Sequence, residues 1–183
     1  MPQFIGQGNF RYAKYDRRTK YVVTLEPHNK TWLFALDVPA ELPSRSNVLA
    51  DLQIRSHRIV TERRRYEMSS YLGYQYGQQA SSAALANALR FDETRNPRTV
   101  ALGREWARQN PDPRAVLALA GRHFATAGYT YTLEPPLLDR QDPYDDFLFN
   151  SKQGFCEHYS GSFALLMRAA GIPARIVTGY QGG

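Results

Sequence analysis

Cys156 is the residue with the clearest chemical potential, and it is the single cysteine of the 183-residue chain. It lies two residues after Gly154 and near the start of a stretch, residues 155–170, that contains no proline and one glycine. A helix is therefore expected to begin near Cys156. A thiol attacks as its thiolate, and the unpaired N–H groups and positive dipole of a helix start favour that anion. The position suits a nucleophile.

The surroundings of Cys156 support acyl chemistry but leave a structural alternative open. Backbone N–H groups at the helix start could stabilise an oxyanion on an attacked carbonyl, where one such donor contributes about 3–4 kcal/mol. Gly154 has no β-carbon, so its backbone could approach a substrate closely. Against this, a lone cysteine on the apolar face of a helix is usually a small buried side chain. Helical spacing forms that face from Cys156, Tyr159, Phe163, Met167 and Ala170.

Two neighbours of Cys156 are further candidates for the acyl site. Gln153 could line it by position, although packing within its loop is an equal alternative. Tyr159 shares the helical face of Cys156, where its ring is expected to pack in the core while its hydroxyl could reach the site. We therefore name Gln153, Gly154 and Tyr159 as candidate substrate-binding residues.

A catalytic thiol also needs a histidine to take its proton and a carboxylate to orient that histidine. His158 lies two residues from Cys156, and side chains at that spacing point about 200° apart around a helix, so packing beside the site is its expected role. His123 is expected to be half-buried on a helix, and His28 and His57 to lie at turns or on the surface. None of the histidines has a convincing zinc spacing, so no metal and no organic cofactor is expected.

The composition is that of a globular chain with a basic surface. It is 43% hydrophobic and 22% charged, with a net charge of +6. Residues 63–65 form the only tight basic cluster, and no recognition helix, zinc finger or RNA-binding aromatic motif accompanies them. Nucleic-acid binding is therefore not expected, whereas attraction to an anionic membrane surface is compatible with the charge. No apolar run approaches the length that spans a bilayer.

The first part of the chain predicts a small antiparallel β region over residues 10–78. The β-prone or alternating runs are residues 21–25, 32–36, 49–56 and 65–72. Within the last of these runs, Tyr66, Met68, Ser70 and Leu72 share one parity. Residues 27–30 indicate a turn. We divide the sequence into a β-rich N-terminal region, residues 1–78, and a second region, residues 79–183.

Helix signals dominate the second region. Asn96–Pro97 and Asp112–Pro113 each place an N-capping residue before a proline at the first helical position. The first pair predicts a helix to about Gln109. The second predicts a helix that ends before Gly128, with an apolar face of Val116, Leu119, Ala120, His123 and Phe124.

The segment around the candidate nucleophile has its own boundary signals. Asp145 and Asp146 are expected to cap a helix rather than to act as acid and base. Residues 129–133 predict an extended segment, because Pro135 and Pro136 exclude a continuing helix. Gly171 is expected to end the Cys156 helix, and residues 175–180 predict a strand after it.

These residues also carry a family resemblance. The run GFCEHYSGSFALLMRAAGIPARIVTGYQGG, which contains Cys156, closely resembles the nucleophile motif of the bacterial transglutaminase-like superfamily. The runs YTYTLEPPLL and DDFLFNSKQGFCEHY resemble its TgpA-type branch, and TWLFALDVPA resembles the extracytoplasmic segment that precedes the core in that branch. The resemblance covers most of the chain and is most specific between Tyr129 and Gly183.

The resemblance implies an α+β protein in which a β-rich N-terminal module precedes the helical first half of a papain-like transglutaminase core. It implies that Cys156 is the nucleophile of a Cys-His-Asp triad. That triad would transfer an acyl group from a glutamine donor, in a protein or peptide, to an amine acceptor through a thioester. It further implies a periplasmic domain of a membrane-anchored parent protein.

The resemblance also places part of the triad outside the chain. In the family the His and Asp follow the equivalent of Arg175–Tyr180, so here they are expected beyond Gly183. The 183-residue chain by itself is then expected to lack appreciable amine-incorporation activity, and Cys156 to act in the parent enzyme. A strand at residues 175–180 would present an unpaired edge, which predicts self-association or domain swapping.

Two other functions stay open on the sequence. The parent protein could be a cysteine protease or amidase on the same scaffold, because transfer and hydrolysis differ only in whether an amine or water accepts the acyl group. The strands and helices could instead form a non-catalytic scaffold or partner-binding module in which Cys156 is inert.

Overall fold

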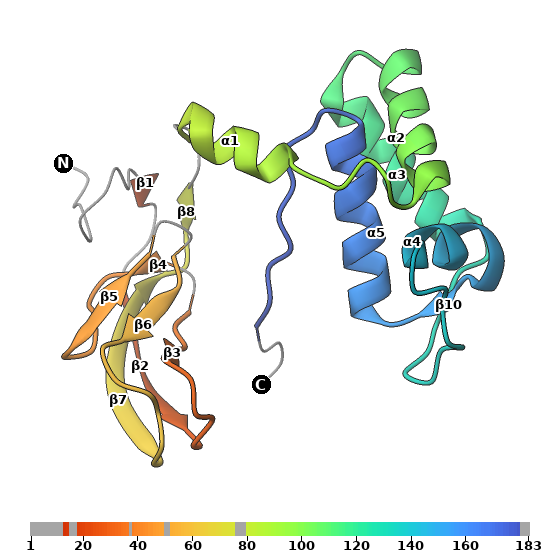
Figure 1. Ribbon diagram of the computed structural model, residues 1–183. Coiled ribbons are helices and arrows are strands. Elements are labelled where there is room, and N and C mark those ends of the chain that lie inside the picture. Colours follow the sequence, from red (N-terminus) through yellow and green to blue (C-terminus); the bar gives the residue numbers. More distant parts are fainter. Residues whose placement is uncertain (1–12, 15–17, 37, 50–51, 76–79, 180–183) are drawn as a thin grey trace. The chain divides into compact units, whose positions relative to one another are not determined.

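The structure, a computed structural model, describes residues 13–14, 18–36, 38–49, 52–75 and 80–179 of the chain. The chain divides into two compact units, Met1–Ala80 and Ser81–Gly183 (Figure 1). The described part of the first unit is built from strands and that of the second mainly from helices, which confirms the expected α+β class. Within the described ranges, no helix has both the length and the apolar character that crossing a bilayer requires.

Short antiparallel sheets make up the described part of the first unit. One sheet orders β2 (Arg18–Leu25), β7 (Arg64–Tyr71) and β4 (Val38–Pro39). A second sheet orders β3 (Trp32–Leu33), β6 (Ile54–Ser56) and β5 (Ser46–Val48). A third pairs β1 (Ala13–Lys14) with β8 (Tyr74–Gln75). The core of the unit gathers Leu25, Leu33, Ile54, Val60, Tyr66 and Met68.

The alternation predicted for β7 holds over its first half. Tyr66 and Met68 are buried while Arg65 and Glu67 are exposed. From Ser69 to Tyr71 every side chain is buried, because this end of β7 is paired on both sides, with β2 and with β4. The expected parity is therefore wrong beyond Met68, and Leu72, outside the strand, is exposed.

Two predicted strands are too long. The run at residues 32–36 forms a strand only at Trp32–Leu33, because the hydroxyl of Tyr66 hydrogen-bonds both the N–H and the carbonyl oxygen of Phe34. The run at residues 49–56 forms a strand only at its end. Leu52 there adopts a left-handed conformation, with φ of 69°, and donates its N–H to the carbonyl of Leu49 in a turn.

The second unit consists of helices joined by short extended segments. Its elements are α1 (Ser82–Leu89), α2 (Pro97–Gln109), α3 (Pro113–Thr126), β9 (Thr130–Tyr131), α4 (Pro143–Asp146), the π-helix η1 (Phe147–Ser151), β10 (Gln153–Gly154) and α5 (Cys156–Ala169). The predicted starts of α2, α3 and α5 are confirmed, as is the stop at Gly171 with φ of 77°. The sequence reasoning missed α1 and η1.

The starts of α2 and α4 cap each other. The carboxylate of Asp145 accepts hydrogen bonds from the backbone N–H groups of Arg98 and Thr99, at 2.9 and 2.7 Å, and from the Thr99 hydroxyl at 2.7 Å. In return the Asn96 side-chain oxygen accepts the N–H groups of Tyr144 and Asp145. The capping role predicted for Asp145 is confirmed, but the helix that it caps is α2 rather than its own.

The second half of α5 is the centre of the core of this unit. Leu166 and Met167 are almost fully buried and pack with Trp106, Val116 and Phe147. Helix α2 crosses α5 so closely that a β-carbon on Gly103 would lie 2.5 Å from the carbonyl oxygen of Leu166. A glycine is therefore required at this crossing.

The strand predicted at residues 175–180 is wrong over its described part, residues 175–179, which form no strand with any described residue. The backbone just before it is held by helices instead of by a strand. The N–H of Ala174 donates to the carbonyl of Ala88 in α1, and its own carbonyl accepts from the guanidinium of Arg168. Tyr180 lies outside the described residues.

Candidate active site

Cys156 occupies the first position of α5, directly after the β10 segment (Figure 1). It is a free thiol and its side chain is exposed. The other members of its predicted helical face, Tyr159, Phe163, Met167 and Ala170, all pack against the core. The interpretation of Cys156 as a small buried core residue is therefore wrong, and its sulfur can be reached by a substrate.

The helix start beneath Cys156 lacks a side-chain cap. The N-cap residue is Phe155, whose side chain has no hydrogen-bond acceptor, and the described side chains supply no acceptor for the N–H groups of Cys156 and Glu157. The carbonyl of Phe155 accepts the N–H groups of His158 and Tyr159. The preceding N–H groups, those of Cys156 and Glu157, have no intrahelical acceptor because they belong to the first turn. They remain available to an anion beside the thiol.

A left-handed residue and a short parallel strand pair bring the chain to this helix start. Helix η1 ends at Ser151, and the next residue, Lys152, turns the chain into β10 with a φ of 52°. In β10, Gln153 lies opposite Thr130 and Gly154 lies opposite Tyr131 of β9. The N–H of Thr132 then donates to the carbonyl of Gly154 at 2.9 Å. The extended segment predicted at residues 129–133 is confirmed at Thr130–Tyr131, whereas Leu133 lies in a bend.

Gly154 is buried against the side chain of His158, which explains why this position holds a glycine. A β-carbon at this position would lie 2.8 Å from the Cβ and Cγ atoms of His158. The ring nitrogen Nδ1 of His158 accepts the backbone N–H of Phe155 at 3.2 Å, and its ring meets that of Phe155 edge-on at 4.5 Å. The packing role expected for His158 is confirmed. The absent side chain of Gly154 gives His158 room to brace the first turn of α5.

Tyr159 lies one turn beyond Cys156 at the border of an aromatic cluster. Its ring stacks on Tyr131 at 6.0 Å and meets Phe147 edge-on at 5.1 Å. Burial, and then the neighbouring Tyr131, raises the pKa of the Tyr159 phenol, which is therefore protonated at neutral pH. Gln153 is exposed on β10. The structure thus brings Gln153, Gly154 and Tyr159 together around the start of α5.

A partly buried hydrogen-bond chain lies behind the aromatic cluster. The Tyr129 hydroxyl donates to the carbonyl of Leu148 at 3.0 Å, and Nε2 of His123 lies 2.9 Å from the same hydroxyl oxygen. Because the hydroxyl proton is already used, Nε2 of His123 is the donor in the second bond. Burial, and then the charge of Lys152, lowers the pKa of His123. Burial raises the pKa of Tyr129 to about 12.

All four histidines of the chain lie in described segments, and none is hydrogen-bonded to Cys156. His123 is part of the chain behind the site, and His158 uses Nδ1 on the backbone. His28 accepts the N–H of Lys30 at the predicted turn, and His57 is exposed as expected. The described residues thus place an exposed thiol beside first-turn N–H groups, whereas no histidine among them is hydrogen-bonded to that thiol.

Tyr131 is the neighbour that sequence reasoning missed. It is 61% exposed, lies opposite Gly154 in the β9–β10 pair and stacks on Tyr159. The signal that could have identified it is its spacing of two residues from Tyr129, because residues two apart on a strand point to the same face; both rings contact Tyr159.

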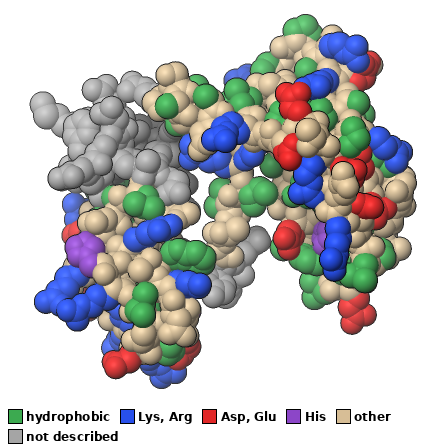
Figure 2. Space-filling view, viewed as in Figure 1, with side chains coloured by type: hydrophobic (Ala, Val, Ile, Leu, Met, Phe, Trp, Pro, Cys, Tyr) green, Lys and Arg blue, Asp and Glu red, His purple; other side chains and the backbone are tan. Residues whose placement is uncertain are grey.

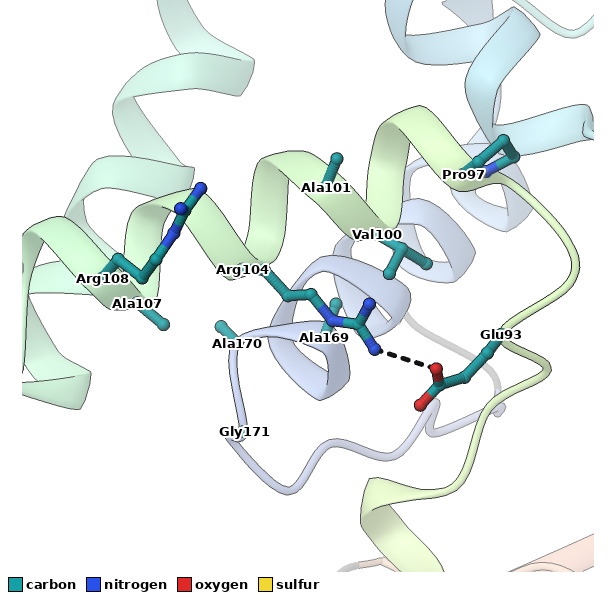
Figure 3. A pocket seen from close by; sticks show the side chains of 10 residues that line it. All are labelled: Glu93, Pro97, Val100, Ala101, Arg104, Ala107, Arg108, Ala169, Ala170 and Gly171. Atoms are coloured by element: carbon teal, nitrogen blue, oxygen red, sulfur yellow. Dashed lines mark ion pairs between the residues drawn. The ribbon is translucent and has the colours of Figure 1, made fainter.

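A groove of the second unit lies elsewhere. It has a volume of about 780 Å³ and runs between α2 and the end of α5, where Arg104 pairs with Glu93 at 3.0 Å (Figure 3). Its α5 residues, Ala169 and Ala170, are at the opposite end of that helix from Cys156, roughly 20 Å away at 1.5 Å per residue. It is separate from the candidate active site.

Two family models match the chain. Residues 101–183 match the core of the transglutaminase-like superfamily, and residues 2–77 match the TgpA N-terminal domain. The matched segments agree with the composition of the two units, since the helical unit carries the core match and the strand unit the N-terminal match.

One relative is similar over the whole chain and another over a third of it. The chain is 35% identical over 182 residues to a protein-glutamine gamma-glutamyltransferase of Pseudomonas aeruginosa, covering 100% of the chain and 27% of that protein. It is 38% identical over 63 residues to the uncharacterized protein YebA of Bacillus subtilis, covering 33% of the chain and 8% of YebA. The chain therefore spans about a quarter of the first relative.

A solved structure has the same fold. The crystal structure of the periplasmic domain of TgpA from Pseudomonas aeruginosa matches with a TM-score of 0.90 and 34% identity. The match covers 100% of this chain and 63% of that one.

Proposed function

This chain belongs to the transglutaminase-like superfamily, and from that premise we propose that Cys156 is the nucleophile of a glutamine-directed acyl transfer. One observation carries the proposal: the only thiol of the chain is exposed at the first position of a 14-residue helix, where no described side chain accepts the N–H groups of Cys156 and Glu157. A structural cysteine would be buried in the core. The relative named as a protein-glutamine gamma-glutamyltransferase supports the same chemistry.

The reaction follows from the groups at the helix start. The thiolate of Cys156 attacks the side-chain carbonyl carbon of a glutamine, and the N–H groups of the first turn stabilise the oxyanion. The carbon–nitrogen bond then breaks, and the leaving nitrogen takes up the proton that the thiol gave up and departs as ammonia. A thioester on Cys156 remains. A primary amine attacks the thioester, loses a proton and displaces the thiolate, which regenerates the enzyme.

We propose that the glutamine donor lies against β10 and the start of α5. Gln153 is exposed there and Tyr159 presents a protonated phenol at its border. Gly154 serves indirectly, because it leaves the space in which His158 braces the first turn. The proton acceptor for the thiol is proposed to be a histidine other than the four in this chain, as the resemblance predicts.

We also propose an extracytoplasmic location, in the periplasm, with the parent protein anchored in the membrane. Two similarities support this: the match to the TgpA N-terminal domain, and the likeness to a structure described as a periplasmic domain. The donor is proposed to be a protein or peptide glutamine and the acceptor a primary amine.

The proposal is tested by amine incorporation in the full-length protein. A glutamine-rich protein such as casein is incubated with a labelled primary amine, using the wild type, Cys156→Ser and Cys156→Ala. We expect incorporation in the wild type and a loss of about 1,000-fold or more in both variants, as is typical when a nucleophile is removed. Incorporation that survives in both variants would refute the assignment of Cys156.

The same assay separates the alternative functions. Release of ammonia without amine incorporation, at any amine concentration, would assign a protease or amidase, because water would then be the only acceptor. The non-catalytic alternative predicts neither product. It also predicts that iodoacetamide alkylates Cys156, the only thiol of the chain, no faster than a cysteine in an unstructured peptide.

A further inference from the structure

Positive charge is concentrated in the first unit. Residues 1–80 contain 12 Lys and Arg against 7 Asp and Glu, a net charge of +5, whereas residues 81–183 contain 11 against 10, a net charge of +1. Lys and Arg side chains gather on the first unit at the lower left of Figure 2. The proposed acyl transfer takes place in the second unit and does not use this charge.

One face of the β3–β6–β5 sheet presents arginine beside tryptophan. In β6, Ile54 and Ser56 are buried and Arg55 between them is exposed. Trp32 lies opposite Arg55 in the register of β3 and β6 and is 50% exposed, while its neighbour Leu33 is buried. Because paired residues of neighbouring strands point to the same side of a sheet, Trp32 and Arg55 lie side by side on the outward face.

Two more exposed arginines lie beside this face, one through a backbone contact and one directly after it in the chain. The backbone N–H of His57 donates to the carbonyl oxygen of Arg45 at 2.9 Å, which holds these two exposed residues together at the next position along the strands. Arg58 follows and is exposed, and Ile59 after it is 57% exposed. We call the surface formed by Trp32, Arg45, Arg55 and Arg58 the Trp–Arg face.

The arginines of the Trp–Arg face have no internal counter-charge. Among the described residues, no ion pair involves Arg45, Arg55 or Arg58. Elsewhere on the same unit, in contrast, Arg63 pairs with Glu26. Positive side chains that are exposed, close together and unpaired are complementary to an anionic partner.

We propose that the Trp–Arg face binds the anionic headgroups of a phospholipid bilayer. A tryptophan side chain prefers the boundary between headgroups and acyl chains, because its ring is apolar and its N–H is polar. Arginine near an anionic bilayer strengthens binding by about fivefold per residue. The exposed Ile59 beside these groups also favours a bilayer over a nucleic acid, since an aliphatic side chain gains from the bilayer boundary and offers a base no stacking surface.

The test uses the 183-residue chain and its own fluorescence. Trp32 and Trp106 are the only two tryptophans, and Trp106 is 6% exposed, so a change caused by vesicles reports on Trp32. We expect sedimentation with vesicles of phosphatidylcholine containing about 30% phosphatidylglycerol, but not with phosphatidylcholine alone. Binding should shift the emission to the blue, protect Trp32 from iodide and weaken as salt is added.

Matched variants separate this face from net charge. The triple variant Arg45→Gln, Arg55→Gln and Arg58→Gln should lose on the order of 100-fold in affinity. The triple variant Arg114→Gln, Arg122→Gln and Arg175→Gln removes the same charge from exposed positions of the second unit, and should lose much less. Trp32→Ala should reduce affinity and abolish the blue shift. Circular dichroism verifies that each variant is folded.

Three outcomes would overturn the proposal. Equal losses in the two triple variants would show attraction by net charge alone. Binding without any change in Trp32 emission would remove the tryptophan from the interface. Tighter binding to a single-stranded oligonucleotide than to the anionic vesicles, with the same dependence on Arg45, Arg55 and Arg58, would assign the face to nucleic acid.

Discussion

Two helix starts in the second unit are built in opposite ways. The start of α2 is closed, because the buried carboxylate of Asp145 takes two of its backbone N–H groups and a hydroxyl. The start of α5 is open, because its N-cap is Phe155 and no described side chain accepts its first N–H groups. The closed start joins two distant segments, whereas the open start carries Cys156.

This difference separates a structural use of a helix start from a chemical one. Both ends present the same unpaired N–H groups and the same positive dipole. At α2 a carboxylate of the protein neutralises them permanently. At α5 no described side chain takes the N–H groups of Cys156 and Glu157, which are the groups that the proposed reaction uses. Substitutions at the two helix starts test this difference, and the largest effect is expected at α2.

Removing the cap of α2 should destabilise the second unit strongly. In Asp145→Ala, buried donors of Arg98 and Thr99 lose a charged acceptor, for which we expect a loss of about 3–4 kcal/mol in the free energy of unfolding. Urea unfolding followed through Trp106 measures it. Asp112→Ala is the control, since that exposed carboxylate accepts a single N–H, from Arg114, and should contribute only about 1 kcal/mol. Equal losses in the two variants would contradict the contrast.

A methyl group placed against His158 at the start of α5 should cause the next largest loss of stability. The new methyl group of Gly154→Ala would meet His158 at 2.8 Å, so we expect a loss of about 2 kcal/mol in stability together with slower acyl transfer. His158→Gly removes both the Cβ and the Cγ that this methyl group would meet. The double variant should therefore be more stable than the sum of the single losses predicts, by about 1 kcal/mol or more. Additive losses would show that the two residues do not interact.

A carboxylate cap added at the start of α5 should raise the free energy of unfolding and lower the reactivity of Cys156. In Phe155→Asp the new carboxylate can accept N–H groups of the first turn and should add about 1 kcal/mol relative to Phe155→Ala. Both variants lose the ring contact with His158, so their difference isolates the cap. The same carboxylate opposes the thiolate of Cys156, and alkylation by iodoacetamide should slow. A faster reaction in Phe155→Asp would contradict the proposed use of this helix start.

The smallest expected effect concerns the hydrogen-bond chain behind α5. Burial, and then Lys152, lowers the pKa of His123 in the folded state, so the unfolded chain binds its proton more readily. This contribution to stability is complete above the ordinary histidine pKa of about 6.5 and is lost as the pH falls below it. His123→Gln should make unfolding midpoints less dependent on pH between about 7.5 and 5. An unchanged dependence would exclude His123 as the cause.

Local signals predicted the helices well and the strands poorly. Asn96–Pro97 and Asp112–Pro113 mark helix starts by chemistry that operates within a few residues, and the structure places α2 and α3 there. Strand ends depend on partners that are distant in sequence. The hydroxyl of Tyr66 ends β3 by hydrogen-bonding Phe34, and the helices α1 and α5 hold Ala174 where a strand was predicted to follow. No local pattern contains those contacts.

The sequence by itself determined that Cys156 would begin a helix, because the absence of proline, Gly171 and the apolar spacing are local properties. Only the tertiary structure decided that the thiol is exposed rather than buried, since exposure depends on which elements cover the first turn. It likewise decided that Gly154 leaves room for His158 and that Tyr131 lies beside Gly154. Those relations arise when β9 and β10, more than twenty residues apart, pair and align their side chains.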